Sequence, residues 1–156
     1  MTQRQNRPPA GGPPPPGVLP DPSTAFGGRA LDRLNTELVI WLTTVGKDGT
    51  PQPNPVWFLL DNDSLLIYNR PDANRITHIE SRPQVALNLD GNGKGGDIIV
   101  IIGTARVVDD VAVPHENPAF VAKYREGMER MYGTIEHFTE THPVAIRIDF
   151  GKVRGF

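Results

Sequence analysis

Short apolar segments separated by turn residues recur along the chain, and this pattern predicts a protein built mainly of β-strands. β-Branched and aromatic side chains dominate residues 39–45, which lead into the sequence GKDG at 46–49, a typical hairpin turn. The return strand is predicted over residues 52–60, and the polar residues 61–63 form a second turn before a strand over 64–69. Three consecutive antiparallel strands of this kind predict a meander.

The second half of the chain continues the pattern. Strands are predicted over residues 85–89, 97–108 and 144–150, and the glycine-rich segment 91–96 forms the loop between the first two. Hairpin connections between most strands favour an antiparallel barrel over a parallel α/β sheet. The expected fold is therefore mainly β (α+β), a six-stranded antiparallel barrel with a few short flanking helices.

Apolar spacing predicts two or three helices. Leu31, Leu34 and Leu38 mark one face of a short helix over residues 30–38. An amphipathic helix is predicted between residues 118 and 133. Its apolar residues at helical spacing are Phe120, Tyr124, Met128 and Met131.

The first 22 residues contain eight of the sixteen prolines and almost no large apolar side chain. Such a segment cannot bury enough surface to offset its ordering entropy. We therefore expect residues 1–22 to form a disordered or polyproline-II tail, and residues 23–156 to form the barrel domain. The functional alternative for the tail is a PxxP ligand for an aromatic groove.

Charge and composition exclude several classes of function. The net charge of -2 argues against a general nucleic-acid binder, which needs a basic surface. The chain has no cysteine, which excludes disulfides, thiol catalysis and cysteine metal sites. Because no apolar run approaches the length of a membrane span and the N-terminus lacks a signal-peptide core, we expect no membrane partner and a cytoplasmic location.

Motifs that would indicate other chemistry lack their required context. The glycines of residues 91–96 precede a strand, whereas a nucleotide-binding loop needs a helix at that point. No GxSxG motif supports a hydrolase. The four histidines lack the spacing of a metal site; they are His78, His115, His137 and His142. We therefore expect no metal.

The segment PQPNPVWF at residues 51–58 carries three alternating prolines. Proline cannot donate a backbone hydrogen bond, so these residues belong at the edge or in an irregular part of a strand. Such a position either leaves backbone groups free to face a ligand or protects an edge strand against aggregation. The spacing does not decide between the two interpretations.

Arg70 and Arg75 flank the predicted start of a further short helix. Asp72 is a suitable N-cap for this helix, which ends near residues 81–83, and Arg75 falls in its first turn. A helix N-terminus presents unpaired N–H groups, to which two arginines would add a phosphate clamp. The alternative is a pair of surface arginines.

Four segments together resemble the pyridoxamine-5′-phosphate-oxidase-like superfamily, the FMN-binding split barrels. Residues 42–58 are similar to its first hairpin and residues 66–87 to its cofactor phosphate segment, while 103–107 and 152–156 are similar to its later strands. The resemblance covers about residues 31–156. The run Asn-Pro-Val-Trp-Phe at 54–58 is most similar to the flavin/deazaflavin oxidoreductase branch, which uses coenzyme F420.

This resemblance implies a split β-barrel homodimer with two cofactor sites at the subunit interface. The cofactor-binding residues that it implies are Asn54, Pro55, Val56, Trp57, Asn69, Arg70, Arg75, Ile76 and His78. Family members often carry lysine and, three residues later, asparagine where this chain has Arg75 and His78. No side chain is assigned a catalytic role, because the hydride chemistry belongs to the cofactor.

The function that the resemblance implies is an oxidoreductase that transfers a hydride between F420 and a small organic substrate. One alternative is an FMN-dependent oxidase or reductase of the same fold. Another is a non-catalytic protein that binds the cofactor or a tetrapyrrole. Because one fold hosts many functions, these alternatives stay open at this point.

Overall fold

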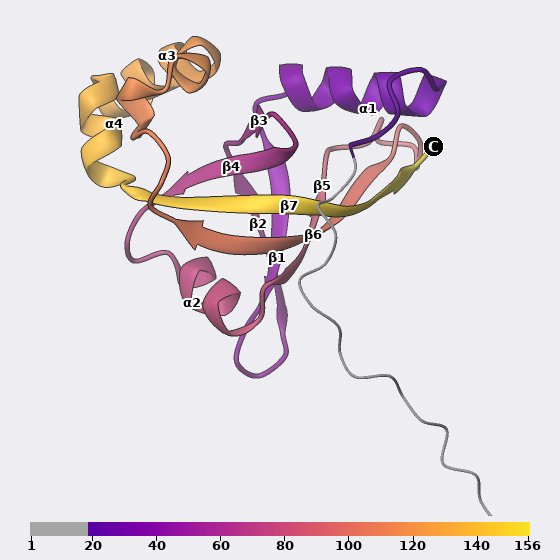
Figure 1. Ribbon diagram of the computed structural model, residues 1–156, viewed down its shortest axis with the longest axis horizontal. Coiled ribbons are helices and arrows are strands. Elements are labelled where there is room, and N and C mark those ends of the chain that lie inside the picture. Colours follow the sequence, from indigo (N-terminus) through magenta and orange to yellow (C-terminus); the bar gives the residue numbers. More distant parts are fainter. Residues whose placement is uncertain (1–18) are drawn as a thin grey trace, which may run out of the picture.

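Seven antiparallel strands form a single curled sheet in the computed structural model, which describes residues 19–156 (Figure 1). Their order across the sheet is β2-β1-β5-β6-β7-β4-β3. The mainly β, antiparallel class is thus confirmed, with seven strands in place of the six predicted. The strands are β1 (Ile40–Val45), β2 (Pro51–Val56), β3 (Leu59–Asp61), β4 (Ser64–Asn69), β5 (Gln84–Asn88), β6 (Ile99–Val108) and β7 (Val144–Gly155).

The additional strand arises because the predicted strand over residues 52–60 is broken. β2 ends at Val56, and β3 begins at Leu59. β2 pairs with β1 at one edge of the sheet, whereas β3 pairs with β4 at the other edge. The predicted meander is therefore wrong, and two separate hairpins, β1–β2 and β3–β4, lie at opposite ends of the strand order.

The short link between β2 and β3 forces the sheet to curl. Three Cα–Cα steps from Val56 to Leu59 span at most about 11 Å. In a flat sheet, the two outer strands of seven would lie roughly 29 Å apart. The two edges must therefore approach each other, which produces a curled half-barrel.

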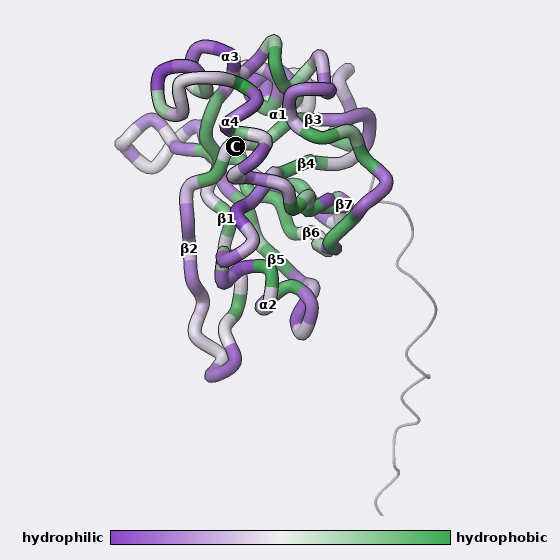
Figure 2. The backbone as a smooth tube through the Cα atoms, turned by 90° about the vertical axis from the view of Figure 1, so that its left-hand side faces the viewer, coloured by the Kyte–Doolittle hydropathy of each residue, from purple (hydrophilic) through white to green (hydrophobic). Residues whose placement is uncertain are grey.

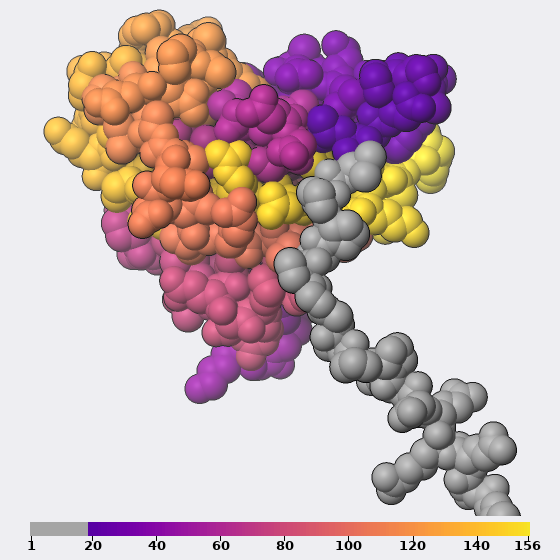
Figure 3. All heavy atoms as spheres, viewed as in Figure 1, coloured from indigo at the N-terminus to yellow at the C-terminus, as the bar shows by residue number. Residues whose placement is uncertain are grey.

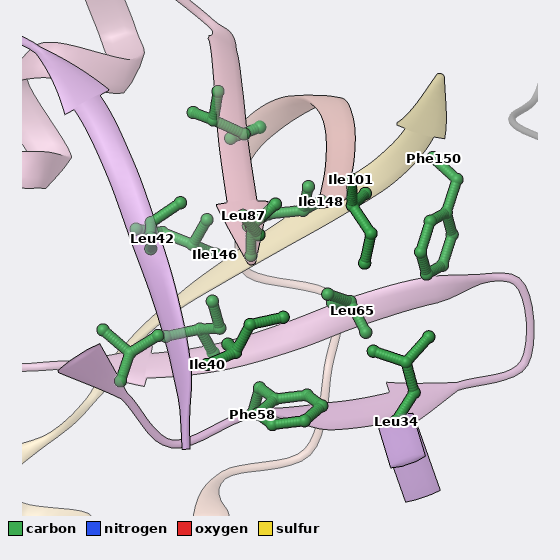
Figure 4. Close-up of a cluster of buried hydrophobic side chains, with 14 of the residues drawn as sticks. Leu34, Ile40, Leu42, Phe58, Leu65, Leu87, Ile101, Ile146, Ile148 and Phe150 are labelled. Atoms are coloured by element: carbon green, nitrogen blue, oxygen red, sulfur yellow. The ribbon is translucent and has the colours of Figure 1, made fainter. Parts of the chain in front are cut away.

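The core fills the inner face of this half-barrel. Along β1, β5 and β6, buried side chains alternate with more exposed ones, so burial of one face fixes the register of each strand. Figure 4 shows side chains from five strands and from the first helix pointing toward one another. The labelled members are Leu34, Ile40, Leu42, Phe58, Leu65, Leu87, Ile101, Ile146, Ile148 and Phe150.

Four α-helices flank the sheet, together with one short 3-10 turn (Pro114–Glu116). The helices are α1 (Ala25–Thr36), α2 (Asn74–Ser81), α3 (Pro118–Tyr132) and α4 (Ile135–Thr141). In Figure 1, α1 and the α3–α4 pair lie along one side of the sheet and α2 lies along the other. In the space-filling view of Figure 3, α3 and α4 (orange to yellow) gather at one corner and α1 (indigo) at another. Within residues 19–156, none of the helices has both the length and the apolar character needed to cross a membrane.

The first helix differs from its prediction. α1 begins several residues earlier, where the Thr24 hydroxyl accepts a hydrogen bond of 2.9 Å from the amide of Gly27. Leu38 lies beyond the end of the helix and is 53% exposed. The predicted face of three leucines is therefore wrong, because the helix buries the small residues Gly27 and Ala30 beside Leu34.

The helix predicted between residues 118 and 133 is confirmed as α3. Phe120, Tyr124 and Met128 are buried, whereas Met131 is 61% exposed. The sequence pattern did not predict α4.

The predicted tail lies mostly outside the described residues. Of residues 1–22, the structure describes 19–22, and here Leu19 packs against the core. The tail and its possible role as a PxxP ligand stay predictions for residues 1–18.

Side chains of α3 hold the break between β2 and β3. The Phe58 amide donates a hydrogen bond of 2.8 Å to the Tyr124 hydroxyl, whose oxygen lies 2.7 Å from the Phe58 carbonyl oxygen and 2.8 Å from that of Leu38. Lys123 Nζ donates to the Phe58 carbonyl at 3.0 Å. Because backbone polar groups need partners, these bonds from α3 replace those of a neighbouring strand and allow the strand to stop here.

Replacement of Tyr124 tests this role. Tyr124→Phe should lower the free energy of unfolding by about 1–3 kcal/mol, because the buried Phe58 N–H loses its acceptor. Tyr132→Phe, at the last residue of the same helix, is the matched control and should change stability little. Denaturant unfolding measures both variants, and equal stability of the two would contradict the assignment.

Candidate functional site

Two adjoining pockets lie where the ends of β2 and β4 meet the start of α2. The larger, of about 410 Å³, extends to α3 and α4 and is called the aromatic pocket; the smaller, of about 290 Å³, extends to β1 and is called the polar pocket. Asp72, Ala73 and Arg75 line both, so the two pockets adjoin at these residues. The aromatic pocket takes its name from Trp57, Tyr68, Tyr132, Phe138 and His142. The polar pocket takes its name from Thr44, Gln52, Asn54, Asn74 and His78.

Trp57 forms one wall of the aromatic pocket. Its ring stacks on Tyr124, with 4.7 Å between centroids and 12° between planes, and on Phe138 at 5.5 Å. Gly127 of α3 makes room for it, since an added Cβ would lie 2.9 Å from a Trp57 ring carbon. These contacts hold the Trp57 ring as a flat apolar surface beside the link between β2 and β3.

Asn69, at the end of β4, brings an unsatisfied acceptor to the same pocket. The side chain is only 2% exposed, and its amide nitrogen donates to the carbonyl oxygens of Ile67 and Val144 at 3.0 and 3.1 Å. Its Oδ1 is buried and has no partner within residues 19–156. Buried polar atoms are usually paired, so this oxygen is a candidate contact for a ligand donor.

Arg75 brings an unsatisfied cation to the boundary between the two pockets. Its Nε is buried without a hydrogen-bond partner among the described residues, and none of their carboxylates forms an ion pair with it. Burial lowers the pKa of its guanidinium. A partly buried cation whose Nε has no partner is unfavourable, so an anion in either pocket would stabilise it.

Arg70 lies near Arg75 but is differently placed. Its side chain is 59% exposed, and its Nε lies 3.3 Å from the Asp72 carboxylate. The prediction that Asp72 caps α2 is therefore wrong: the N-cap is Ala73, and Asp72 belongs to the preceding turn, facing Arg70. Because no side chain caps α2, the N–H groups of its first turn are left without a side-chain acceptor beside the polar pocket.

The polar pocket is built on β1, β2 and α2. His78 Nδ1 lies 2.9 Å from the hydroxyl of the buried Thr44, which fixes the position of its imidazole. Asn54 lies on β2, which is an edge strand, as its prolines predicted, and is hydrophilic along most of its length (Figure 2).

The structure brings eight of the nine predicted cofactor-binding residues to these pockets. The exception is Ile76, which packs against the hydrophobic core and lines neither pocket. Those in the aromatic pocket are Pro55, Val56, Trp57, Asn69, Arg70 and Arg75; those in the polar pocket are Asn54, Arg75 and His78.

The sequence interpretation missed the wall that α3 and α4 contribute. Tyr132, Phe138 and His142 follow Trp57 by more than seventy residues. The helical spacing over residues 118–133 indicated that α3 covers some apolar surface, but it did not identify that surface. No three side chains of the types that bind metals gather anywhere in residues 19–156.

Residues 28–154 match the protein family described as Pyridoxamine 5'-phosphate oxidase. The chain belongs to this family. The matched range includes every residue that lines the two pockets. Among curated proteins, none matches the sequence significantly.

Solved structures of the same fold have different ligands in their names. An F420 reductase shares 22% sequence identity with a TM-score of 0.61, and the match covers 79% of this chain and 94% of that one. An FAD-binding protein from Mesorhizobium loti shares 20% at a TM-score of 0.57, covering 79% and 86%. The heme storage protein HutZ from Vibrio cholerae shares 13% at a TM-score of 0.56, covering 80% and 91%. At these identities the likeness shows the fold alone.

Arg75→Met tests whether this arginine is held for a ligand rather than for the fold. The ligand-free variant should be at least as stable as the wild type, with a gain of up to about 1 kcal/mol, because a buried N–H without a partner is removed. Arg70→Met, which removes an exposed guanidinium, should change stability little. Thermal unfolding in phosphate-free buffer provides the measurement. A marked loss of stability in Arg75→Met would indicate a structural role instead.

Proposed function

We propose that the protein is an oxidoreductase that binds the deazaflavin coenzyme F420 and transfers a hydride between it and a small organic substrate. The observation that carries the proposal is the continuity of an aromatic pocket with an unpaired, partly buried cation, Arg75. A cofactor with a flat ring and an anionic side arm needs an apolar surface for the ring and a cation for the arm.

The residues present fit such a cofactor at three points. The Trp57 wall offers an apolar surface for a flat ring, and Asn69 Oδ1 offers an acceptor for a ring N–H group. Arg75, Arg70 and the uncapped first turn of α2 offer a positive site for a phosphate. When bound, the deazaflavin supplies the hydride chemistry, while the protein positions the ring and limits the access of water.

The polar pocket favours the deazaflavin over FMN. It lies next to Arg75 and has a volume of about 290 Å³. Its neutral side chains Gln52, Asn54 and Asn74 offer hydrogen bonds to a tail longer than a single phosphate. The similarity of fold to an F420 reductase supports the same choice.

Two alternatives have observations in their favour. FMN has a similar ring and one phosphate, so the aromatic pocket and Arg75 alone would serve it. A non-catalytic tetrapyrrole binder is supported by the fold of HutZ and by His142, an imidazole on the wall of the aromatic pocket.

The cytoplasmic location also stays a prediction.

Fluorescence titration of the purified protein with F420, FMN and haemin separates the three possibilities. F420 should bind more tightly than FMN, because only its longer tail reaches the polar pocket. Equal or tighter binding of FMN would contradict the cofactor assignment, and preferred binding of haemin would support the non-catalytic alternative.

Arginine variants show whether binding uses the site described here. Arg75→Ala should weaken F420 binding by about ten- to a hundredfold, the loss expected for one charge-assisted hydrogen bond. Arg75→Lys should lose less, because it keeps the charge without the planar fork. Binding of Arg75→Ala at wild-type affinity would place the anion site elsewhere.

We also propose that the protein acts as a homodimer. Ile102 lies on β6, near the middle of the sheet, and is 40% exposed on the outer face. It pairs with Ala86 of β5, which in turn pairs with Thr43 of β1, and on its other side it pairs with Lys152 of β7. An exposed apolar residue in the middle of a sheet is suited to contact with a second subunit.

Light scattering of the purified protein should give the mass of a dimer at micromolar concentration. Ile102→Lys should shift the protein toward monomer and weaken cofactor binding, because a desolvated charge at the interface is unfavourable. Ile102→Val keeps the apolar surface and should remain dimeric. A monomeric wild type that still binds cofactor would overturn the proposed assembly.

A further inference from the structure

His142 follows the last residue of α4 and lies on the wall of the aromatic pocket. Its imidazole stacks on Phe138 with 4.2 Å between centroids and 9° between planes, and it meets Tyr132 edge-on at 5.2 Å. Two aromatic rings therefore fix the plane of the imidazole. The proposed cofactor-binding residues do not include it.

Hydrogen bonds along α4 determine which ring nitrogen of His142 carries the proton. The Thr141 hydroxyl oxygen lies 3.1 and 3.0 Å from the carbonyl oxygens of His137 and Phe138. A carbonyl only accepts, so the single hydroxyl hydrogen points to one of these two oxygens. The Thr141 oxygen then accepts a hydrogen bond from His142 Nδ1, which lies 2.8 Å away.

With the proton on Nδ1, the lone pair of the neutral imidazole is on Nε2. Nδ1 faces its own helix, whereas Nε2 lies on the opposite side of the ring. None of the residues 19–156 forms a hydrogen bond with Nε2, so it is open to a ligand of the pocket that His142 lines.

The surroundings favour the neutral form of this imidazole. Burial lowers the pKa of His142, a contact with the Phe138 carbonyl opposes the shift, and the positive charges of Arg70 and Arg75 lower the pKa further. The other titratable groups that line the aromatic pocket are Tyr68, Asp72 and Tyr132. Of these, the Asp72 carboxylate faces Arg70.

We propose that His142 is the proton-accepting residue of the aromatic pocket, whose Nε2 binds an O–H or N–H group of the substrate while Arg70 and Arg75 hold the phosphate of the cofactor. The substrate class is therefore a small molecule with an O–H or N–H donor. An anion at the two arginines reduces their repulsion of the imidazolium, so its binding favours uptake of a proton by His142.

The chemical step rests on the proposed oxidoreductase function. In a substrate alcohol, the O–H bond breaks and its proton passes to Nε2. A bound oxidised deazaflavin would accept the hydride that leaves the neighbouring C–H bond as the C=O bond forms. In the reverse direction, Nε2 would return the proton to the carbonyl oxygen while the reduced cofactor supplied the hydride to the carbonyl carbon.

Two benzoates test the contact without any flavin. 4-Hydroxybenzoate and 4-fluorobenzoate share a ring and a carboxylate, but only the first carries an O–H donor. The wild type should bind 4-hydroxybenzoate about two- to tenfold more tightly, the effect of one hydrogen bond. His142→Phe should remove this preference and still bind 4-fluorobenzoate, whereas Arg75→Met should weaken both ligands alike and keep the preference.

NMR of the histidine nitrogens provides a second measurement, whose main result is obtained from the wild type. The wild type should show the Nδ1–H tautomer for His142, with a pKa below that of an ordinary histidine that rises when 4-hydroxybenzoate binds. Arg75→Met should raise the pKa of His142 in the ligand-free protein, since one repelling charge is gone. The signals of His115 and His137, which line neither pocket, should not respond to the ligand.

Four results would each overturn the inference. They are an Nε2–H tautomer, a pKa that does not respond to ligand, a donor preference that survives in His142→Phe, and failure of the wild type to bind either benzoate at millimolar concentration. Failure of the proposed function has a different signature: the wild type would not bind F420, whatever the benzoate results. The two proposals can therefore fail separately.

Discussion

The rest of the structure depends on the two-residue link between β2 and β3. Trp57 and Phe58 carry the chain from one edge of the strand order to the other, which is possible only if the sheet curls. The Tyr124 hydroxyl bonds the backbone of Phe58, and the Tyr124 ring stacks on Trp57. The same side chain therefore holds the closure of the half-barrel and the wall of the aromatic pocket. A change that loosens one of them also disturbs the other.

Parts of the fold that depend on neighbouring residues could be predicted from the sequence. The β1–β2 hairpin and the bounds of β4 follow from turn residues and from short apolar runs. The break at Phe58 could not be predicted in this way, because its partner Tyr124 lies 66 residues further along the chain. A continuous apolar run, residues 56–60, crosses the break, so the pattern describes one strand where the structure has two. The missing seventh strand and the wrong meander have this single cause.

The same distinction applies to the site. Residues 54–57 and 69–78 are short segments whose spacing alone left the interpretation open, and the family resemblance implied a ring site and a phosphate site there. Ile76 belongs to the second segment, but it faces the core, because a short helix with one buried face cannot present every residue to the pocket. The wall from α3 and α4 could not be predicted, since nothing local to Phe138 or His142 identifies Trp57 as a neighbour.

Two unpaired buried atoms of the aromatic pocket indicate which groups a ligand needs in order to bind there. Asn69 Oδ1 is an acceptor and Arg75 Nε is a donor, yet both are buried and neither pairs with the other or with any further residue of 19–156. Folding usually pairs such groups, because an unpaired buried polar atom is unfavourable. Two backbone carbonyls hold the Asn69 side chain, and the backbone of Arg75 belongs to α2. A ligand with both a donor and an anion satisfies the two atoms together, whereas an apolar ligand of equal size leaves both unpaired. For the proposed ligand, we therefore expect recognition to require both polar groups in addition to the aromatic wall.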